Sequence, residues 1–473
     1  MSDATSAFAI FVLAFSWASF VVVGLRNLVS FVQLIGAAVV FWRRTRPTRA
    51  AQTLWVRQAD CVPAITIIAP AYNEELSIVQ SVRSLLALEY PDHEVIVVND
   101  GSKDATVDKL VEAFGLERVE RRQVAPLQQT KILGVYASKK YPNLTVVDKE
   151  NGRKADAANA GIGFALTPLV CIIDADSIIE SDGLLRATEP FMTDDGSLVA
   201  VGGAIRIVNG CTIVGGSLQK IGISSNWLAR FQVVEYLRAF LTARVANAGL
   251  NSLLLISGAF GIFDRKTLVE IGGYRHDTVG EDFELVVRIH RHMRELDRPY
   301  KIDFVPEIVC WTEAPVSMLG LRNQRARWQQ GALETLVEHR RMIGNPRYGR
   351  IGLLALPHVV LEDVIGPPAE LIGYLVIPIA WALGILDPDM ALGYLALTFL
   401  FGTALSLGTL ALEELQLRRT PTARHLAILM ISAIIENFGF RQAVLLFRLI
   451  GIKRFFRNET AWSPVPRVGF NAG

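Results

Sequence analysis

The stretch Leu169-Val-Cys-Ile-Ile-Asp-Ala-Asp176 decides how this chain folds. Its first five residues are apolar, as in a strand buried inside a sheet, and two carboxylates follow directly. In an extended segment alternate residues share a side, so Asp174 and Asp176 can face the same divalent cation. Such a pair is also common in ordinary loops, so its meaning depends on what surrounds it.

Two similar apolar runs precede this stretch. They are Ala64-Ile-Thr-Ile-Ile-Ala69 and Glu94-Val-Ile-Val-Val98, and the apolar spacing from 78 to 86 between them predicts a helix. Strands that alternate with helices predict an α/β, Rossmann-like domain with a mostly parallel sheet. In such sheets the ligand site lies at the carboxyl ends of the strands, where Asp100 follows the second run.

The composition divides the chain between membrane and water. Of 473 residues 51% are hydrophobic, yet 48 Lys and Arg and 46 Asp and Glu remain. The net charge of +2 gives no general attraction to nucleic acid, and we expect no nucleic-acid partner. The four cysteines are scattered without a metal-binding pattern and fit a reducing cytosol.

The first apolar segment runs from Phe8 to Trp42 and contains one charged residue, Arg26. We predict a single tilted membrane crossing extended by an interfacial turn. Arg43, Arg44, Arg46 and Arg49 follow it, so the positive-inside rule places Ala50 in the cytoplasm.

Further apolar segments follow Arg350. Residues 364–386 and 391–412 are each long enough to cross a bilayer. The runs 426–435 and 443–452 are too short individually. They form either one crossing with an embedded Glu436 and Arg441 pair or a re-entrant hairpin, and the basic flanks on both sides favour the hairpin.

These segments predict four parts. A membrane helix with a basic cytosolic flank occupies residues 1–49, and a cytosolic α/β domain ending in interfacial helices occupies 50–345. A membrane region with two crossings and a third segment covers 346–458. The tail 459–473 is expected in the cytosol and contains a candidate gating segment around Trp462.

Several polar motifs in the middle domain could carry chemistry. Lys154-Ala-Asp156 offers a cation and a carboxylate near the strand that ends at Asp174, although the face of an amphipathic helix would look the same. Asp100 could equally be a turn cap, and Glu281-Asp282 could supply a general base or cap a helix.

The motif Gln324-Arg-Ala-Arg-Trp328 is the hardest to explain structurally. Trp328 offers a flat face to a sugar ring, and Arg327 or Gln324 can bind phosphate or hydroxyl groups. The alternative is an interfacial anchor, because Trp and Arg favour the membrane surface.

Taken in order, these motifs resemble the signature of family 2 glycosyltransferases with a GT-A fold. The last motif is similar to that of the processive branch, which makes cellulose, chitin, hyaluronan and poly-N-acetylglucosamine. The resemblance covers roughly residues 64–331 and implies a GT-A domain inserted between transmembrane helices. The residues that carry it are Asp100, Lys154, Asp156, Asp174, Asp176, Glu281, Asp282, Gln324, Arg327 and Trp328.

The resemblance implies a role for each matching residue. Asp282, with Glu281 beside it, would deprotonate the acceptor hydroxyl, and Asp176 would ligate Mg²⁺ or Mn²⁺ on the donor diphosphate. Trp328, Ser257 and Gly258 would contact the acceptor sugar. The residues implied to bind the nucleotide or its diphosphate are Glu74, Asp100, Lys154, Asp156, Asp174, Gln324 and Arg327.

The implied function is an inverting β-glycosyltransferase in a bacterial inner membrane, with a cytosolic catalytic domain. It would polymerise sugar from a UDP-sugar, either UDP-N-acetylglucosamine or UDP-glucose, and translocate the growing polysaccharide. One alternative is a single transfer to a lipid acceptor, and another is a non-catalytic membrane scaffold. The motifs do not specify the donor sugar.

Overall fold

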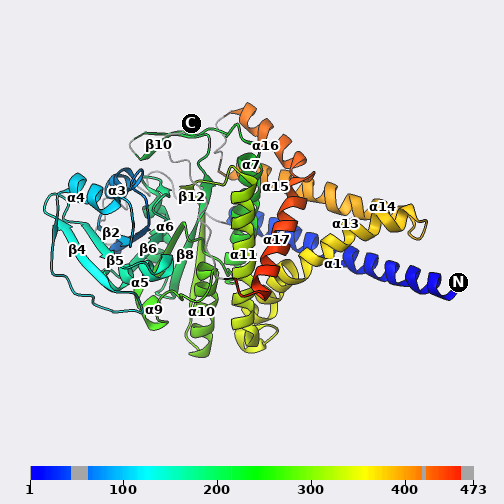
Figure 1. Ribbon diagram of the computed structural model, residues 1–473, viewed down its shortest axis with the longest axis horizontal. Coiled ribbons are helices and arrows are strands. Elements are labelled where there is room, and N and C mark those ends of the chain that lie inside the picture. Colours follow the sequence, from blue (N-terminus) through cyan, green and yellow to red (C-terminus); the bar gives the residue numbers. More distant parts are fainter. Residues whose placement is uncertain (1, 44–61, 215, 418–421, 460–473) are drawn as a thin grey trace.

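The strand that ends before Asp174 lies in the middle of a ten-stranded sheet. The structure is a computed structural model that describes residues 2–43, 62–214, 216–417 and 422–459. Figure 1 shows the sheet and its helices at one end of the molecule and long helices, including α1, extending from the other. The expected basic residues at 44, 46 and 49 and the tail from 460 lie outside the described residues.

The large sheet has the strand order β3-β4-β5-β2-β1-β6-β11-β8-β12-β7, and β9 and β10 form a separate hairpin. The strands are β1 (Ile65–Ala71), β2 (His93–Asp100), β3 (Leu116–Arg118), β4 (Ile132–Ser138), β5 (Leu144–Lys149), β6 (Leu169–Ile173), β7 (Ile178–Ile179), β8 (Leu198–Ile207), β9 (Thr212–Val214), β10 (Ser217–Lys220), β11 (Phe260–Asp264) and β12 (Lys301–Thr312).

The expected Rossmann-like core is confirmed, but the sheet as a whole is mixed. Strands β5, β2, β1 and β6 are parallel neighbours, as the alternation of strands and helices predicts. Beyond them, β11 pairs antiparallel with both β6 and β8. The expectation of a mostly parallel sheet therefore holds for this core and for the β8–β12 pair, while five of the nine pairings are antiparallel.

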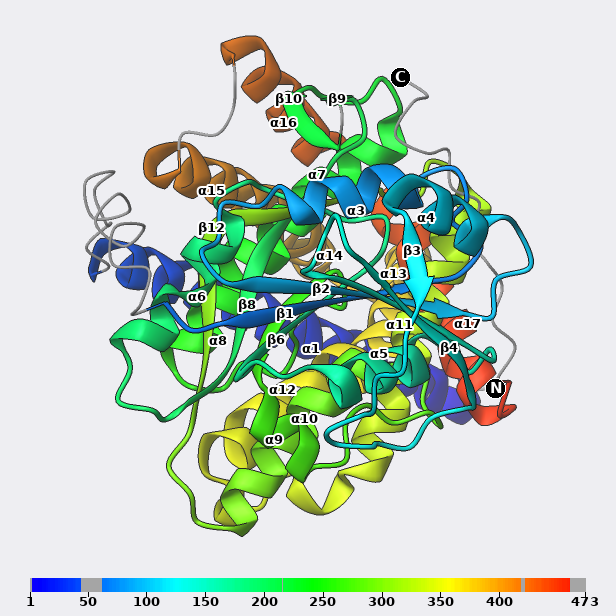
Figure 2. The same ribbon diagram turned by 90° about the vertical axis from the view of Figure 1, so that its left-hand side faces the viewer.

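Helices cover both faces of the parallel core, and Figure 2 shows α3 and α4 on one side of β1 and β2 and α5 on the other. Small residues dominate α5, which lets it approach the sheet closely. At Gly161 a Cβ atom would lie 2.3 Å from Cγ2 of Ile68, so only glycine fits this contact. The helices of this part are α3 (Ile78–Leu86), α4 (Thr106–Phe114), α5 (Arg153–Phe164), α6 (Gly183–Thr193), α9 (Arg265–Glu270) and α10 (Glu281–Glu295).

A continuous helical segment, α7 (Trp227–Arg238), the π-helix η2 (Ala239–Arg244) and α8 (Val245–Gly249), lies between the sheet and the long helices. It packs against α1 and also contacts β8 and β12. The long α11 (Met318–Glu338) carries the Gln324–Trp328 motif, and two short 3₁₀ turns follow it, η3 (Arg340–Met342) and η4 (Pro346–Tyr348).

Three helical segments are long and apolar enough to cross a membrane, at 8–43, 351–382 and 388–416. The first lies in one unbroken helix, α1 (Ser2–Arg43), so the single predicted helix is present and the predicted interfacial turn is absent from its described length. The other two consist of η5 (Ile351–Ala355), α12 (Leu356–Val359), η6 (Val360–Ile365) and α13 (Gly366–Ala382), then α14 (Pro388–Leu395), η7 (Ala396–Leu400) and α15 (Phe401–Gln416).

The last apolar region forms α16 (Ala423–Ile435) and α17 (Phe440–Phe456), which are bent by 59° at the break between them. This bend is compatible with a broken span and with a re-entrant loop. Glu436 is fully buried at the break, and it pairs with Arg238 of α7 and accepts a hydrogen bond from Ser406 at 3.0 Å. Among the described residues, the embedded carboxylate therefore pairs with Arg238 of α7, which packs against β8, rather than with Arg441.

Candidate active site

The two carboxylates after β6 occupy the end of a strand whose five residues are all buried. Asp174 is partly exposed, and its Oδ1 lies 2.7 Å from Nζ of Lys154 on α5. Asp176, two residues further along the chain, is buried. The sheet therefore fixes a carboxylate pair at its carboxyl edge, with a lysine from the neighbouring helix already in contact with the first member.

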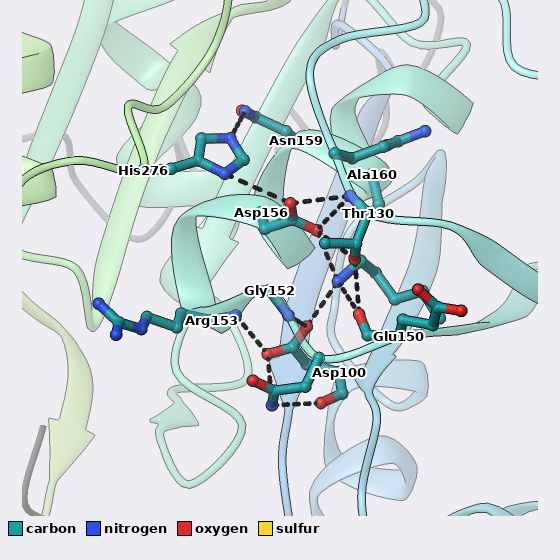
Figure 3. A network of polar contacts seen from close by, with 12 residues as sticks. Asp100, Thr130, Glu150, Gly152, Arg153, Asp156, Asn159, Ala160 and His276 are labelled. Atoms are coloured by element: carbon teal, nitrogen blue, oxygen red, sulfur yellow. Dashed lines mark hydrogen bonds and ion pairs between the residues drawn. The ribbon is translucent and has the colours of Figure 1, made fainter.

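Asp100 ends β2 and organises the loop that leads into α5 (Figure 3). Only 3% of it is exposed, and its carboxylate accepts hydrogen bonds from Lys149 Nζ at 2.6 Å and from the backbone amides of Gly152 and Arg153 at 2.9 and 2.8 Å. A carboxylate satisfied in this way holds the loop in place. In this structure Asp100 thus positions the residues before Lys154 and presents no free oxygen to a nucleotide.

Asp156 plays a similar part from within α5 and is 1% exposed. It shares Lys149 with Asp100, since Lys149 Nζ lies 2.6 Å from its Oδ1, and it accepts the backbone N–H of Thr130 at 2.9 Å. Figure 3 also shows His276 beside it, with Nδ1 3.3 Å from Oδ2. Asp156 therefore connects α5 to the loop that precedes Asp282.

Asp282 lies in the first turn of α10, two residues after Gly280. At Gly280 an added Cβ would lie 2.7 Å from Cα of Gly331 on α11, so the two backbones touch where neither residue has a side chain. This contact brings the start of α10 against the helix that carries the Gln324–Trp328 motif. Gly331 lies three residues after Trp328, so the contact is close to the motif itself.

Gly258 brings a backbone segment directly against Asp282 and Lys154. A Cβ at this position would lie 2.2 Å from Oδ2 of Asp282 and 2.4 Å from Nζ of Lys154. The carbonyl oxygen of Gly258 accepts a hydrogen bond from Lys154 Nζ at 3.1 Å. Lys154 therefore joins the Ser257-Gly258 turn to Asp174, with Asp282 alongside.

The electrostatics of this cluster suit a base. Burial, assisted by the charges of Glu281 and Asp174, raises the pKa of Asp282 to about 6, although Lys154 and Arg327 act in the opposite direction. Its Oδ1 is buried and accepts no hydrogen bond from the part of the chain that the structure describes. Burial lowers the pKa of Lys154, but the charges of Asp174 and Asp282 outweigh it and hold that pKa above its ordinary value.

The motif on α11 is held by a buried arginine. Arg325 pairs with Glu235 of α7 at 2.7 Å, and its guanidinium lies 4.3 Å from the centre of the Trp328 ring. Trp328 is 43% exposed, so much of the ring stays accessible. Arg327 is half-buried, and its charge acts on Asp282. One helix thus presents an aromatic surface and a cation near the base.

The structure brings together six of the thirteen predicted site residues: Lys154, Asp174, Gly258, Glu281, Asp282 and Arg327. Glu74 lies in the turn before α3, where its Oε2 accepts a hydrogen bond from Ser77 at 2.7 Å. Asp176 and Ser257 flank the cluster in the chain. Gln324 has a buried Oε1 that accepts no hydrogen bond from the described residues.

Sequence reasoning missed Lys149, His276, Tyr236 and Arg244. Lys149 is the fully buried cation between Asp100 and Asp156, and its only signal is a lysine at the end of an apolar strand. Tyr236 and Arg244 belong to no recognisable motif. The charge of Asp174 contributes to the pKa of Tyr236, and the charge of Asp282 contributes to that of Arg244.

The side chains available as metal ligands limit which metal ion this site could hold. Among residues 2–43, 62–214, 216–417 and 422–459 no group of three or more His, Cys, Asp or Glu side chains could hold a metal ion by itself. Asp174 and Asp176 offer hard oxygen ligands from two side chains. These residues therefore fit a Mg²⁺-like ion that takes its remaining ligands from substrate phosphates and water.

Comparison with known families agrees with this site. The profile of glycosyl transferase family 2 matches residues 66–268, and that of glycosyl transferase family group 2 matches residues 169–433. The second match covers more than half of the chain and includes Asp174, Asp282 and the α11 motif. The chain belongs to the family 2 glycosyltransferases, and it is an enzyme of that class.

Among curated proteins, the chain is similar to poly-β-1,6-N-acetyl-D-glucosamine synthases. It is 28% identical over 306 residues to that of Staphylococcus epidermidis, covering 64% of this chain and 63% of the relative. The synthase of Staphylococcus aureus strain COL is 29% identical over 279 residues, covering 59% and 57%. The match thus spans somewhat under two thirds of each relative.

Solved glycosyltransferase structures align more distantly. A mannosyltransferase from Pyrobaculum calidifontis, solved with GDP-mannose and Mn²⁺, has a TM-score of 0.49 and 20% identity, covering 89% of this chain and 99% of that chain. Glucosyl-3-phosphoglycerate synthase from Mycobacterium tuberculosis has a TM-score of 0.35 and 17% identity, covering 65% and 85%.

Proposed function

We propose that this chain is a processive, inverting β-glycosyltransferase that polymerises a UDP-sugar and passes the polysaccharide across a bacterial inner membrane. The similarity to poly-β-1,6-N-acetyl-D-glucosamine synthases supports UDP-N-acetylglucosamine as the donor, with UDP-glucose as the competing choice. The proposal includes the division into a membrane helix at 1–49, a cytosolic catalytic domain at 50–345, a membrane region at 346–458 and a cytosolic tail.

The observation that carries the proposal is the position of Asp282. This carboxylate has a pKa of about 6, and it lies against Gly258 and Lys154 while Lys154 contacts Asp174. An inverting transfer needs a base on one face of the anomeric carbon and stabilisation of the departing diphosphate on the other. Asp282 is the base in this proposal, and the cations belong to the leaving-group side.

In the proposed mechanism the acceptor sugar rests on the exposed ring of Trp328. Asp282 takes the proton of the attacking hydroxyl as the new glycosidic bond forms at the anomeric carbon. The bond from that carbon to the diphosphate breaks, and Lys154 and Arg327 stabilise the charge that develops on the diphosphate. A divalent metal held by Asp176, with Asp174 beside it, would add Lewis-acid stabilisation to the same leaving group.

Processivity and translocation are supported by the position of the motif helix. α11 packs along α17 and also contacts η6, so the exposed Trp328 lies on a helix embedded between the catalytic domain and candidate membrane helices. At Gly451 of α17 a Cβ would lie 2.5 Å from the carbonyl oxygen of Ala326, which makes this contact tight. A polymer extended at Trp328 would therefore grow beside the membrane region.

The full-length protein in detergent, supplied with Mg²⁺ or Mn²⁺ and radiolabelled UDP-N-acetylglucosamine or UDP-glucose, tests the proposal. We expect a polymer from one donor and loss of transfer in Asp282→Asn, with Asp297→Asn, an exposed acidic residue beyond the end of α10, as the control. A product of one or two sugars on a lipid would contradict processivity, and absence of transfer from every UDP-sugar would contradict the function itself.

A further inference from the structure

A cation outside the predicted motifs lies near the base. Arg244 ends the π-helix η2, and its guanidinium carbon lies 3.8 Å from the centre of the Phe240 ring, which holds it in place. Its Nη1 is buried and has no hydrogen-bond partner among the described residues. Since a buried guanidinium N–H without an acceptor is costly, this atom is prepared for an oxygen that arrives with a ligand.

The π-helix determines where this arginine points. In a regular α-helix, residues 236 and 244 would differ by about 80° in direction, because eight residues turn the helix by about 800°. A π-turn inserts one residue, so the same eight residues act as seven and the difference falls to about 20°. Tyr236 and Arg244 therefore lie on one face of the helical segment, with the buried Phe240 between them.

The carboxylates near this face of the helix are those of the candidate active site. Burial lowers the pKa of Arg244 to about 10, and Tyr236 and Asp282 act in the opposite direction, so both lie within electrostatic reach. Burial also raises the pKa of Tyr236, and Asp174 is among the charges that act on it. The same segment is tied to the motif helix, because Glu235, next to Tyr236, pairs with Arg325 of α11 at 2.7 Å, and the Arg325 guanidinium lies 4.3 Å from the centre of the Trp328 ring. The face formed by Tyr236, Phe240 and Arg244 therefore belongs to a segment joined to the helix of Trp328, and Arg244 lies within electrostatic reach of Asp282.

The element that carries Arg244 indicates which ligand this arginine would contact in the candidate active site. Lys154 comes from α5 on the sheet and is already in contact with Asp174, whereas Arg244 comes from η2, which packs against the membrane helix α1. The approach is close, since a Cβ at Gly249 of α8 would lie 2.9 Å from Val40 of α1. In the proposed mechanism the acceptor sugar rests on Trp328, whose helix α11 packs along α17, so the acceptor lies on the side of the candidate membrane helices and the diphosphate departs from the opposite face of the reacting carbon.

We propose that Arg244 is an acceptor-binding residue, whose Nη1 donates a hydrogen bond to an oxygen of the sugar that Asp282 deprotonates. Hydroxyl oxygens and the carbonyl oxygen of an acetamido group are both suitable acceptors. Phe240 and the π-helix fix the guanidinium so that little side-chain freedom is lost on binding. This inference rests on the proposed function, because it assumes that a sugar acceptor reaches Asp282.

The test uses full-length protein in detergent with UDP-N-acetylglucosamine as donor and a β-1,6-linked N-acetylglucosamine oligosaccharide as acceptor. Arg244→Met and Arg244→Lys are compared with Arg230→Met, a control on α7 whose guanidinium also lies over a ring, that of Trp227 at 4.9 Å. Three quantities are measured: the acceptor KM, the slow hydrolysis of the donor without acceptor, and the Kd for UDP.

For Arg244→Met we expect the acceptor KM to rise by about 10- to 100-fold, the usual effect of losing a charged hydrogen bond. Donor hydrolysis and the Kd for UDP should stay within about twofold of the unaltered protein, which also shows that the variant is folded. Arg244→Lys, which keeps the charge without the planar guanidinium, should have an intermediate acceptor KM, and Arg230→Met should match the unaltered protein.

Two results would overturn this role for Arg244. One is an unchanged acceptor KM in Arg244→Met. The other is a parallel loss of donor hydrolysis and UDP binding, which would assign Arg244 to the donor side or to folding. Failure of the proposed function is distinguishable, because in that case the unaltered protein would transfer no sugar to the oligosaccharide.

Discussion

At the scale of single residues, the proposed mechanism depends on the ionisation of Asp282, whose pKa responds to the charges of Lys154, Glu281 and Asp174. This pKa is raised to about 6, and a base must be unprotonated to act. The observed rate constant kcat/KM should therefore be level above this pH and fall about tenfold per pH unit below it.

A substitution of Lys154 tests the same prediction, because the direction in which it should shift the pKa of Asp282 is known. Its positive charge lowers the pKa of Asp282, so Lys154→Met should raise that pKa and move the acidic limb of the profile to higher pH. A pH profile of residual activity in the variant measures the shift. An acidic limb that stays at the same pH would contradict the assignment of Asp282 as the titrating base.

Gly258 supplies a second residue-scale prediction. The atoms that an added Cβ would meet are the ends of the Asp282 and Lys154 side chains, which can move without unfolding the protein. Gly258→Ala should therefore keep its thermal unfolding midpoint while losing at least about tenfold in kcat, because the base and its cation are displaced.

The matched control is Gly393→Ala in α14, where the added Cβ would make an ordinary 3.6 Å contact with Phe20. It should leave both the midpoint and the rate unchanged. Full activity in Gly258→Ala would mean that the close approach of this backbone to the base has no catalytic importance.

The sequence singled out the two carboxylates of the proposed mechanism but not all of the residues that surround them. Asp174 and Asp282 stand at a strand end and a helix start, positions that local patterns reveal. Lys149 pairs with Asp100, 49 residues away along the chain, and Arg244 is within electrostatic reach of Asp282, 38 residues away. No local pattern encodes such long-range relations. Asp100 and Asp156 were predicted as ligand contacts, and only the fold shows that they hold Lys149 between them.

At the scale of elements, the contact between α10 and α11 sets the distance from Asp282 to the helix that carries Trp328. A Cβ on Gly331 would lie 2.5 Å from Cα of Gly280, and backbone atoms cannot move aside as side chains can. We expect Gly331→Ala to separate the helices, to destabilise the fold by about 1–3 kcal/mol and to lower the transfer rate.

Thermal unfolding and initial rates measured on the same preparation of Gly331→Ala test this contact. Gly258→Ala serves as the comparison, since it should lose rate without losing stability. A Gly331→Ala variant with unaltered stability and rate would show that the two helices are not locked together by this crossing.

The buried network of Asp100, Lys149 and Asp156 should contribute measurably to the free energy of unfolding. Lys149 is fully buried between the two carboxylates, so Lys149→Met would leave buried negative charge uncompensated and cost about 3–5 kcal/mol. The control is Lys139→Met, whose 84% exposed side chain pairs with Glu117 and should contribute about 0–1 kcal/mol.

Chemical denaturation of the two variants measures this difference. Equal stabilities of Lys149→Met and Lys139→Met would contradict the role of the network as the anchor of the loop before α5. Because burial of the network decides its energy, the contrast could not be drawn from the sequence, in which Lys149 and Lys139 look alike.

The elements themselves were predictable to different degrees. The parallel strands β1, β2 and β6 alternate with helices and have apolar runs, so their arrangement follows from the sequence. The antiparallel insertion of β11 between β6 and β8 does not, because β11 follows a helical segment that packs on other elements. The sequence also shows no local pattern for the extra residue in the π-helix η2, which changes the direction of Arg244.

At the scale of the whole molecule, the catalytic domain and the long helices are joined through buried ion pairs. Arg206 of β8 pairs with Glu413 of α15, and Arg238 of α7 pairs with Glu436. The hydrophobic excess predicted this division into two regions. It did not reveal that α7 links them, with Glu235 paired to the motif helix and Arg238 paired to Glu436 between α16 and α17.

The length distribution of the product tests the central claim most directly. Full-length protein is mixed with excess β-1,6-linked N-acetylglucosamine oligosaccharide and radiolabelled UDP-N-acetylglucosamine, and products are sized at early times. The account predicts a few long chains beside unextended oligosaccharide, all absent with Asp282→Asn. A uniform population extended by one or two sugars, or equal synthesis by Asp282→Asn, would contradict it.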